Sequence, residues 1–143
     1  MNTNNTIKIL LNIYLSDNYN IDLEFIKNNS IKTVIFINYS GFENIEEQNE
    51  FYDKINISIS TNVNFDNINE LIIDTLKKSN NILIISDKNL IGFVVISAFM
   101  INYLDVSFFQ VLLLDKIYNI QINKTVYYKI LHSYYCAKKN FLV

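Results

Sequence analysis

The sequence has no proline and no tryptophan, only two glycines and a single cysteine among its 143 residues. A chain that is half apolar and so poor in glycine and proline does not have the composition of a disordered or low-complexity segment. The single cysteine, Cys136, excludes an internal disulfide bond, and with the single histidine, His132, it is too few for a tetrahedral zinc site. At this length we expect one folded domain over residues 1–143, with no metal and no cofactor.

A large excess of charge of one sign is also lacking. The net charge of −2 argues against nucleic acid as a partner. The chain shows no basic-then-apolar leader, so no secretion signal is predicted. Its longest uncharged apolar run, Leu90 to Ile101, spans about a dozen residues, whereas a membrane helix needs roughly 20. We therefore expect a soluble, intracellular (cytoplasmic) protein without a membrane partner. Its heavy use of Asn and Ile is typical of an AT-rich genome.

Short apolar runs alternate with helical patterns along the chain. Val34 to Ile37 and Ile82 to Ile85 are continuous apolar runs, typical of central strands covered on both faces. The alternation of Ile55, Ile57 and Ile59 with polar residues predicts a strand with one drier face. Strands that alternate with helices predict an α/β fold, in which a mostly parallel central sheet carries helices on both faces.

Helices are predicted mainly in the second half of the chain. A cap at Asn64 or Asp66 precedes apolar residues at helical spacing, and Lys77 and Lys78 close that helix. Phe93 to Tyr103 is apolar nearly all round, which predicts a helix buried in the middle of the domain. Two further helices are predicted over Val106–Tyr118 and Lys124–Lys139.

One loop lies where an α/β sheet of this kind binds its ligands. Beyond the carboxyl end of a strand, backbone N–H groups meet the N-terminus of the next helix. Here that place follows the apolar run Ile82 to Ile85, and its residues are Ser86, Asp87, Lys88, Asn89, Leu90, Ile91 and Gly92.

The motifs around this loop resemble those of the small dual-specificity (cysteine-dependent) protein phosphatases, including the compact poxviral ones. The resemblance implies a protein-tyrosine-phosphatase-like fold over most of the chain. Five pieces carry it, in the family's order: Asn12–Ser16 resembles the opening "LYLG" strand, Ile31–Ile37 the "gI..Vin" strand, Ile55–Ile59 the strand before the general-acid loop, Asn81–Tyr103 the "VLVHCxxGxSRS" element with its "AYLM" helix, and Ile120–Leu131 the "i.pN...f...L" helix start.

The residues that perform the family's chemistry are missing. The family motif places Ser86 at the nucleophilic cysteine, Ile85 at the preceding histidine, Asn89 at the loop glycine and Gly92 at the arginine that clamps the phosphoryl oxygens. The family's general-acid aspartate would fall at Thr61 or Asn62, directly after Ser60. None of these three residues has a carboxylate side chain.

These losses predict an inactive site. A serine hydroxyl has a far higher pKa than the thiolate-forming cysteine, and no base is placed to activate Ser86. Gly92 supplies no charge, and the loss of a general acid alone costs about 10²–10⁴-fold in rate. Lys88 is expected to point to solvent, and Leu90 and Ile91, taken as loop residues, are expected to fill the space of a phosphoryl group.

The resemblance therefore implies a pseudophosphatase that acts as a protein-binding or scaffold module, or as a decoy for an active phosphatase. One alternative is a phosphopeptide-binding module that uses the remaining loop N–H groups. A second is an active α/β hydrolase of another family.

The last predicted helix carries candidate interface residues. Its aromatic stripe is broader than one core face needs, and tyrosine is enriched at interfaces. We expect this helix and the C-terminal Phe141-Leu142-Val143 to take part in self-association as a homodimer. The acidic stretch Glu43 to Glu50 is interpreted as a solvated loop, with docking of basic partners as the alternative. The stripe consists of Tyr127, Tyr128, Tyr134 and Tyr135.

Overall fold

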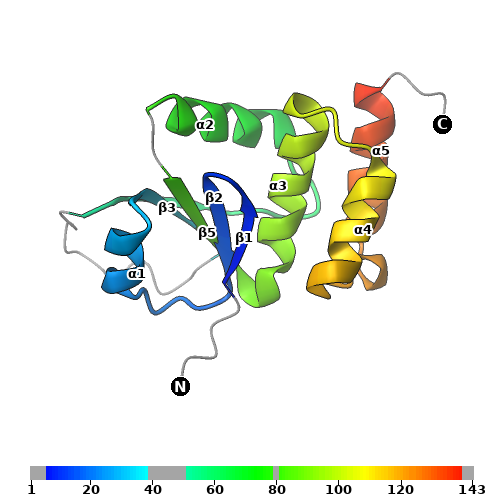
Figure 1. The fold of residues 1–143 in the computed structure, drawn as a ribbon. Coiled ribbons are helices and arrows are strands. Elements are labelled where there is room, and N and C mark those ends of the chain that lie inside the picture. The colour runs from blue at the N-terminus through cyan, green and yellow to red at the C-terminus, as the bar shows by residue number, and fades with distance from the viewer. Residues whose placement is uncertain (1–5, 39–50, 79–80, 140–143) are drawn as a thin grey trace.

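The computed structural model describes residues 6–38, 51–78 and 81–139, which form a central β-sheet flanked by helices (Figure 1). The sheet has five strands in the order β1-β2-β5-β3-β4. β1 is antiparallel to β2 and the other neighbours are parallel, which confirms the predicted mostly parallel sheet. The strands are β1 (Ile7–Leu10), β2 (Ile13–Ser16), β3 (Ile31–Ile37), β4 (Asp53–Ile57) and β5 (Asn81–Ile85).

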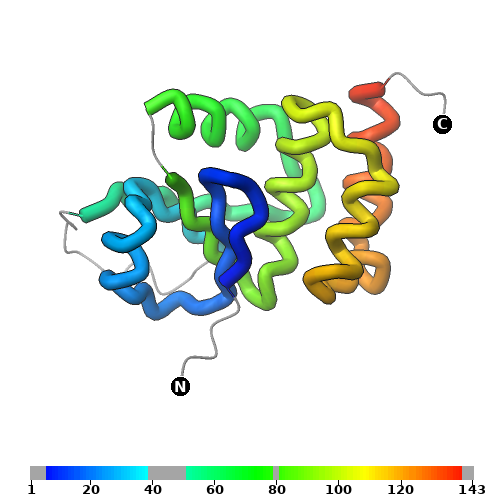
Figure 2. The backbone as a smooth tube through the Cα atoms, viewed as in Figure 1, coloured from blue at the N-terminus to red at the C-terminus, as the bar shows by residue number. Residues whose placement is uncertain are grey.

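Strand β5 is the centre of the sheet. It pairs with β2 on one side and with β3 on the other. The N-terminal hairpin of β1 and β2 therefore lies beside a strand that is much later in the sequence (Figure 2). Ile82, Ile84 and Ile85 are each 0% exposed. Because helices cover both faces of this strand, it carries a continuous apolar run in place of an alternating one.

Helices lie on both faces, as predicted. α1 covers one face, α2 and α3 cover the other, and α4 and α5 form a further layer outside α3 (Figure 1). Alternate residues of β3 therefore enter two separate apolar clusters, with Ile35 and Ile37 facing α3 and with Val34 and Phe36 on the side of α1. The helices are α1 (Leu23–Asn28), α2 (Phe65–Lys77), α3 (Leu90–Tyr103), α4 (Phe108–Tyr118) and α5 (Tyr127–Lys138).

The ends of the helices follow from local chemistry. The side chain of Asn64, one of the two predicted caps, accepts a hydrogen bond from the N–H of Asn67 at 3.3 Å. At the start of α4, Ser107 and Gln110 form a reciprocal capping box. α3 is buried from Gly92 to Ile101, as its apolar sequence predicts, but it begins at Leu90, before the expected start.

Two expectations from the sequence lie outside the described residues. These are the acidic stretch Glu43 to Glu50 and the C-terminal Phe141-Leu142-Val143. In the three described ranges, no helix combines the length and the apolar character needed to cross a membrane.

Candidate functional site

Residues 86–92 run from the carboxyl end of β5 into the first turn of α3. Ser86 has an extended backbone, and its N–H donates to the carbonyl oxygen of Ser16 at 3.1 Å, which prolongs the pairing of β5 with β2. A single 3₁₀ turn, η2 (Asp87–Asn89), follows it. Leu90 and Ile91 already belong to α3, so the expectation that they lie in the loop is wrong.

The turn contains two successive left-handed residues. Lys88 has φ 54° and Asn89 has φ 61°. The family resemblance gives a glycine at the position of Asn89, and asparagine is among the few other residues that adopt this conformation readily. Asn89 is buried, whereas Lys88 is exposed, as the sequence predicted. The tight reversal at these two residues lets the helix start early.

The hydroxyl of Ser86 is turned inward. Ser86 is 1% exposed, and its Oγ accepts a hydrogen bond from the N–H of Gly92 at 2.8 Å. Its carbonyl oxygen accepts from the N–H of Asn89 at 3.2 Å, and the N–H of Leu90 donates to the carbonyl of Asp87. A phosphate cradle requires N–H groups that converge on a shared centre. Three N–H groups of this loop are instead bonded to oxygens of the loop itself.

Gly92 faces the packed interior. A Cβ atom at this position would lie 3.0 Å from Ser86 Oγ, 3.3 Å from Ile84 Cγ2 and 3.5 Å from Leu15 Cδ2. A charged side chain that began here would start among buried apolar groups.

The composition adds a point that the loop motif alone does not give. All of the 12 basic residues counted as lysine or arginine are lysines. A bidentate clamp on phosphoryl oxygens requires a guanidinium group, because a lysine is a point charge without the planar fork. The printed sequence therefore offers no arginine from any other position to replace the one missing from the loop.

The expected general-acid position follows β4. Thr61 and Asn62 are both exposed and lie at the same edge of the sheet as the loop after β5, with β3 between the two strands. This segment is held by Asn38, a residue that the sequence analysis did not single out. Its Oδ1 accepts from the N–H of Ile59 at 2.7 Å, and its Nδ2 donates to the carbonyl of Ile59 at 3.0 Å. A polar residue after an apolar run is common at the end of a strand, so the sequence alone did not predict these two hydrogen bonds to Ile59.

A cavity of about 620 Å³ opens beside the loop. Lys88 and Asn89 form part of its wall, together with Asp17 after β2. The end of α4 adds residues 117–120, and Thr6 and Ile7 at the start of β1 complete the wall. The exposed side of the loop therefore borders a hollow, while the Ser86 hydroxyl is on the buried side.

Comparison with solved structures identifies the fold. A leucine rich repeat and phosphatase domain containing protein from Entamoeba histolytica matches with a TM-score of 0.69 and 18% identity, over 94% of this chain and 93% of that one. TpbA from P. aeruginosa, in complex with pTyr, matches with a TM-score of 0.72 and 10% identity, over 95% and 91% of the two chains. The fold is that of the dual-specificity and tyrosine phosphatases.

The phosphatase fold is shared with a third protein. The human tyrosine phosphatase-like serine/threonine/tyrosine-interacting protein matches with a TM-score of 0.59 and 12% identity, over 96% of this chain and 86% of that one. No family model matches the sequence, and no curated protein matches it either. At these identities the likeness concerns the fold alone.

In this phosphatase fold, the predicted interface tyrosines of α5 make contacts within the chain. The Tyr134 hydroxyl donates to Asp66 Oδ1 at 2.8 Å and accepts from Asn69 Nδ2 at 2.9 Å. Burial, with the hydrogen bond to Asp66, raises the pKa of Tyr134 well above its usual value. The rings of Tyr128 and Tyr135 lie 5.4 and 6.1 Å from that of Phe108, centroid to centroid. Like these three, Tyr127 is half-buried and packs against the main core.

The structure also shows the contacts of Asp66 and Cys136, two residues considered in the sequence analysis. Asp66 lies in the first turn of α2, where Lys138 Nζ is 2.9 Å from its Oδ1, so it is directed at α5. The hydrogen bonds from Lys138 and Tyr134 hold the pKa of Asp66 below its usual value. Cys136 is buried, and its Sγ lies 3.8 Å from Nε2 of His132, whose ring packs on Phe108.

Proposed function

We propose that this chain is a pseudophosphatase, which keeps the phosphatase fold to bind a protein partner and does not hydrolyse phosphate esters. It acts as an interaction module, or as a decoy that competes with an active phosphatase for a shared partner. The observation that carries this proposal is the Ser86 hydroxyl. The hydroxyl is buried and hydrogen-bonded to the N–H of Gly92, so it is not presented to a phosphorus atom.

The electrostatics of the loop support the same proposal. Phosphoryl transfer is accelerated chiefly by donors and cations that stabilise the charge on the equatorial oxygens. The N–H groups of Asn89, Leu90 and Gly92 are engaged within the loop. The one loop cation, Lys88, lies on the exposed rim. Neither Thr61 nor Asn62 has a carboxylic acid that could donate a proton to the leaving group.

The human neighbour gives an analogy for this function. Its name describes a protein that is tyrosine phosphatase-like and serine/threonine/tyrosine-interacting. A shared fold does not transfer function, so the proposal for this chain rests on the loop and the analogy only agrees with it.

A second candidate function is the binding of a phosphopeptide. The cavity beside Lys88 favours it, because a phosphorylated side chain there would meet one cation. With three of the loop N–H groups engaged within the loop, a single lysine predicts an affinity for phosphate in about the millimolar range or weaker. We therefore prefer protein binding that does not depend on phosphate.

The decisive experiment measures hydrolysis and anion binding on the same protein. We expect no turnover of a fluorogenic aryl phosphate or of phosphotyrosine peptides at neutral pH, and none in Ser86→Cys either, because the missing arginine is not restored. We also expect millimolar phosphate to raise the melting temperature no more than chloride of equal ionic strength does.

Two results would change the conclusion. Hydrolysis that disappears in Ser86→Ala would refute the pseudophosphatase proposal and favour an active hydrolase. Stabilisation by phosphate that is lost in Lys88→Ala, with Lys77→Ala as the exposed control, would favour the phosphopeptide module.

A further inference from the structure

Helix α4 exposes an apolar stripe to solvent. Phe109, Leu113 and Ile117 are spaced four residues apart and are 68%, 46% and 70% exposed. The opposite side of the helix is buried in the core through Phe108 and Val111. Single apolar residues at a surface are ordinary, but a continuous apolar stripe marks an interaction site. We call these three residues the α4 stripe.

The exposed charged side chains of residues 106–134, which include the α4 stripe, are basic. From residue 106 to residue 134 the one acidic side chain is Asp115, which is buried and accepts a hydrogen bond from the N–H of Ile122 at 3.1 Å. The lysines of this stretch are all exposed. None of them takes part in an ion pair within the described residues, and the same holds for Lys88 on the loop. These lysines are Lys116, Lys124 and Lys129.

Two hollows adjoin the C-terminal half of α4, and Asn119 borders both. The cavity of about 620 Å³ is lined by Ile117 and Lys88, and also by Asp17. A second cavity of about 460 Å³ is lined by Leu112 and Lys116, and also by Asp115, whose carboxylate accepts the hydrogen bond from Ile122. Side chains of a segment lying along the α4 stripe would therefore find space beside the helix, with a lysine in each hollow.

We propose that the α4 stripe docks an acidic amphipathic helix of a partner protein. Its apolar face would cover Phe109, Leu113 and Ile117, and its carboxylates would pair with Lys88 and Lys116. A second copy of this chain does not fit as well. Its own α4 would bring the same lysines and no exposed carboxylate from residues 106–134, so charge complementarity favours a different, acidic protein.

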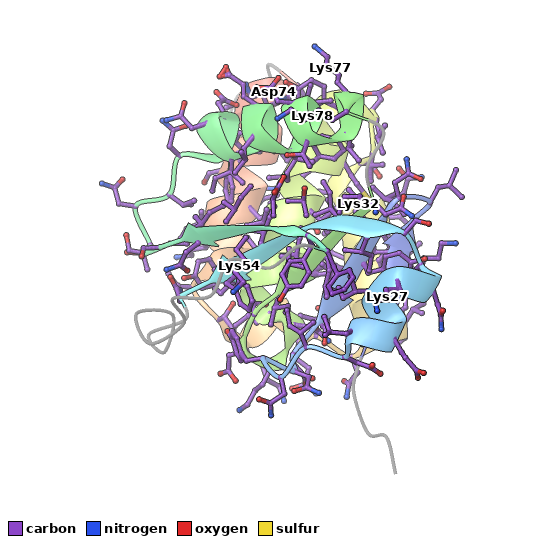
Figure 3. All side chains as sticks on the ribbon, turned by 90° about the vertical axis from the view of Figure 1, so that its left-hand side faces the viewer. Lys27, Lys32, Lys54, Asp74, Lys77 and Lys78 are labelled. Carbon is purple, nitrogen blue, oxygen red and sulfur yellow. The ribbon has the colours of Figure 1, made fainter. Side chains whose placement is uncertain are left out.

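The side of the molecule opposite α4 also carries lysines, which can serve as controls. Figure 3 labels five lysines there, on α1, β3, β4 and the end of α2. Lys27 lies over the ring of Phe51 at 4.2 Å, and Asp74 lies on the same helix as Lys77. That side therefore supplies a control lysine, Lys77, which is exposed like Lys116 and lies away from α4.

The test uses a designed probe and the full chain. The probe is a fluorescein-labelled helical peptide of about 18 residues, with leucines at helical spacing and glutamates at the other positions. Its analogue carries lysines in place of the glutamates. Fluorescence anisotropy is expected to show that the glutamate peptide binds and that the lysine analogue binds at least about tenfold more weakly.

Variants of exposed residues locate the binding. Leu113→Ser, Ile117→Ser and Lys116→Glu are each expected to weaken binding of the glutamate peptide about tenfold, which corresponds to one decade of Kd. Two matched controls should bind as wild type does. Leu11→Ser alters a side chain that is 79% exposed between β1 and β2, and Lys77→Glu alters the lysine at the end of α2. Thermal melts would verify that every variant is folded.

Several outcomes would overturn the inference. Equal binding of the two peptides, or binding that survives both serine substitutions, would show that the α4 stripe is not an acidic-helix site. Dimerisation that depends on concentration and is lost in Leu113→Glu would assign the stripe to a second copy. The inference rests on the proposed protein-binding function, yet the two fail separately: hydrolysis of an aryl phosphate would refute the pseudophosphatase, and loss of peptide binding would refute only this surface.

Discussion

The substitution Ser86→Ala tests whether the loop is closed on itself. It removes the Oγ that accepts the hydrogen bond from the N–H of Gly92 at 2.8 Å. That N–H lies in buried packing, beside Ile84 and Leu15, where no water replaces the lost acceptor. Ser97→Ala is the matched control. Ser97 is 0% exposed, and among the described residues its Oγ has no hydrogen-bond partner.

Of the two substitutions, only Ser86→Ala should destabilise the fold. A buried donor left without its acceptor costs about 1–3 kcal/mol, so Ser86→Ala should lower the free energy of unfolding by that amount. For a chain of this length, the melting temperature should fall by about 3–9 °C. Ser97→Ala removes a buried hydroxyl that makes no bond and places a better helix former in α3. It should be neutral or stabilising by about 0.5 kcal/mol.

Urea unfolding followed by circular dichroism measures both changes on the same scale. An open loop would let water reach Ser86, and its substitution would then fall within about ±0.5 kcal/mol, as ordinary surface changes do. A Ser86→Ala variant as stable as Ser97→Ala would therefore refute the closed loop and, with it, the main support for an inactive site.

Three further predictions follow from single contacts. Gly92→Arg should cost more than about 3 kcal/mol or prevent folding, because its side chain begins in buried apolar packing; a soluble variant with the wild-type melting temperature would contradict this. Asn38→Ala should cost about 2 kcal/mol in urea unfolding, since it removes both hydrogen bonds to Ile59 and a residue suited to φ 57°; a change under about 0.5 kcal/mol would mean that the clamp is not formed. The carboxylate of Asp66, whose pKa is lowered by hydrogen bonds from Lys138 and then Tyr134, stabilises the fold above the ordinary carboxyl pKa, and this contribution is lost as the pH falls through the lowered value. Wild type and Asp66→Asn should thus differ by up to about 1 kcal/mol at neutral pH, because the carboxylate is largely exposed, and the difference should disappear as the pH falls below the lowered pKa; a gap independent of pH would exclude this assignment.

The fold could be predicted from the sequence because its main signals are local. The apolar runs Val34 to Ile37 and Ile82 to Ile85 are β3 and β5, and the cap at Asn64 starts α2. These signals reflect burial and capping within a few residues. The strand order depends on pairings between distant segments, and only the family resemblance pointed to it.

The candidate site could be located from the sequence, but its geometry could not. The pattern placed the loop between β5 and α3 and predicted that Lys88 is exposed. It did not predict the left-handed pair of Lys88 and Asn89, because asparagine is equally common in turns and caps. The hydrogen bond between Ser86 and Gly92 depends on where the helix starts, which a sequence pattern fixes only to within a few residues.

The central place of β5 has a consequence for synthesis on the ribosome. β2 and β3 are not paired with each other: the pair β1–β2 and the pair β3–β4 are joined only through β5, which is made last of the five strands. At about 5–20 residues per second, the interval between Ile57, the end of β4, and Asn81, the start of β5, lasts roughly 1–5 s. Throughout that interval the nascent chain holds two unjoined half-sheets, β1–β2 and β3–β4, each with an apolar strand edge and no neighbour to cover it.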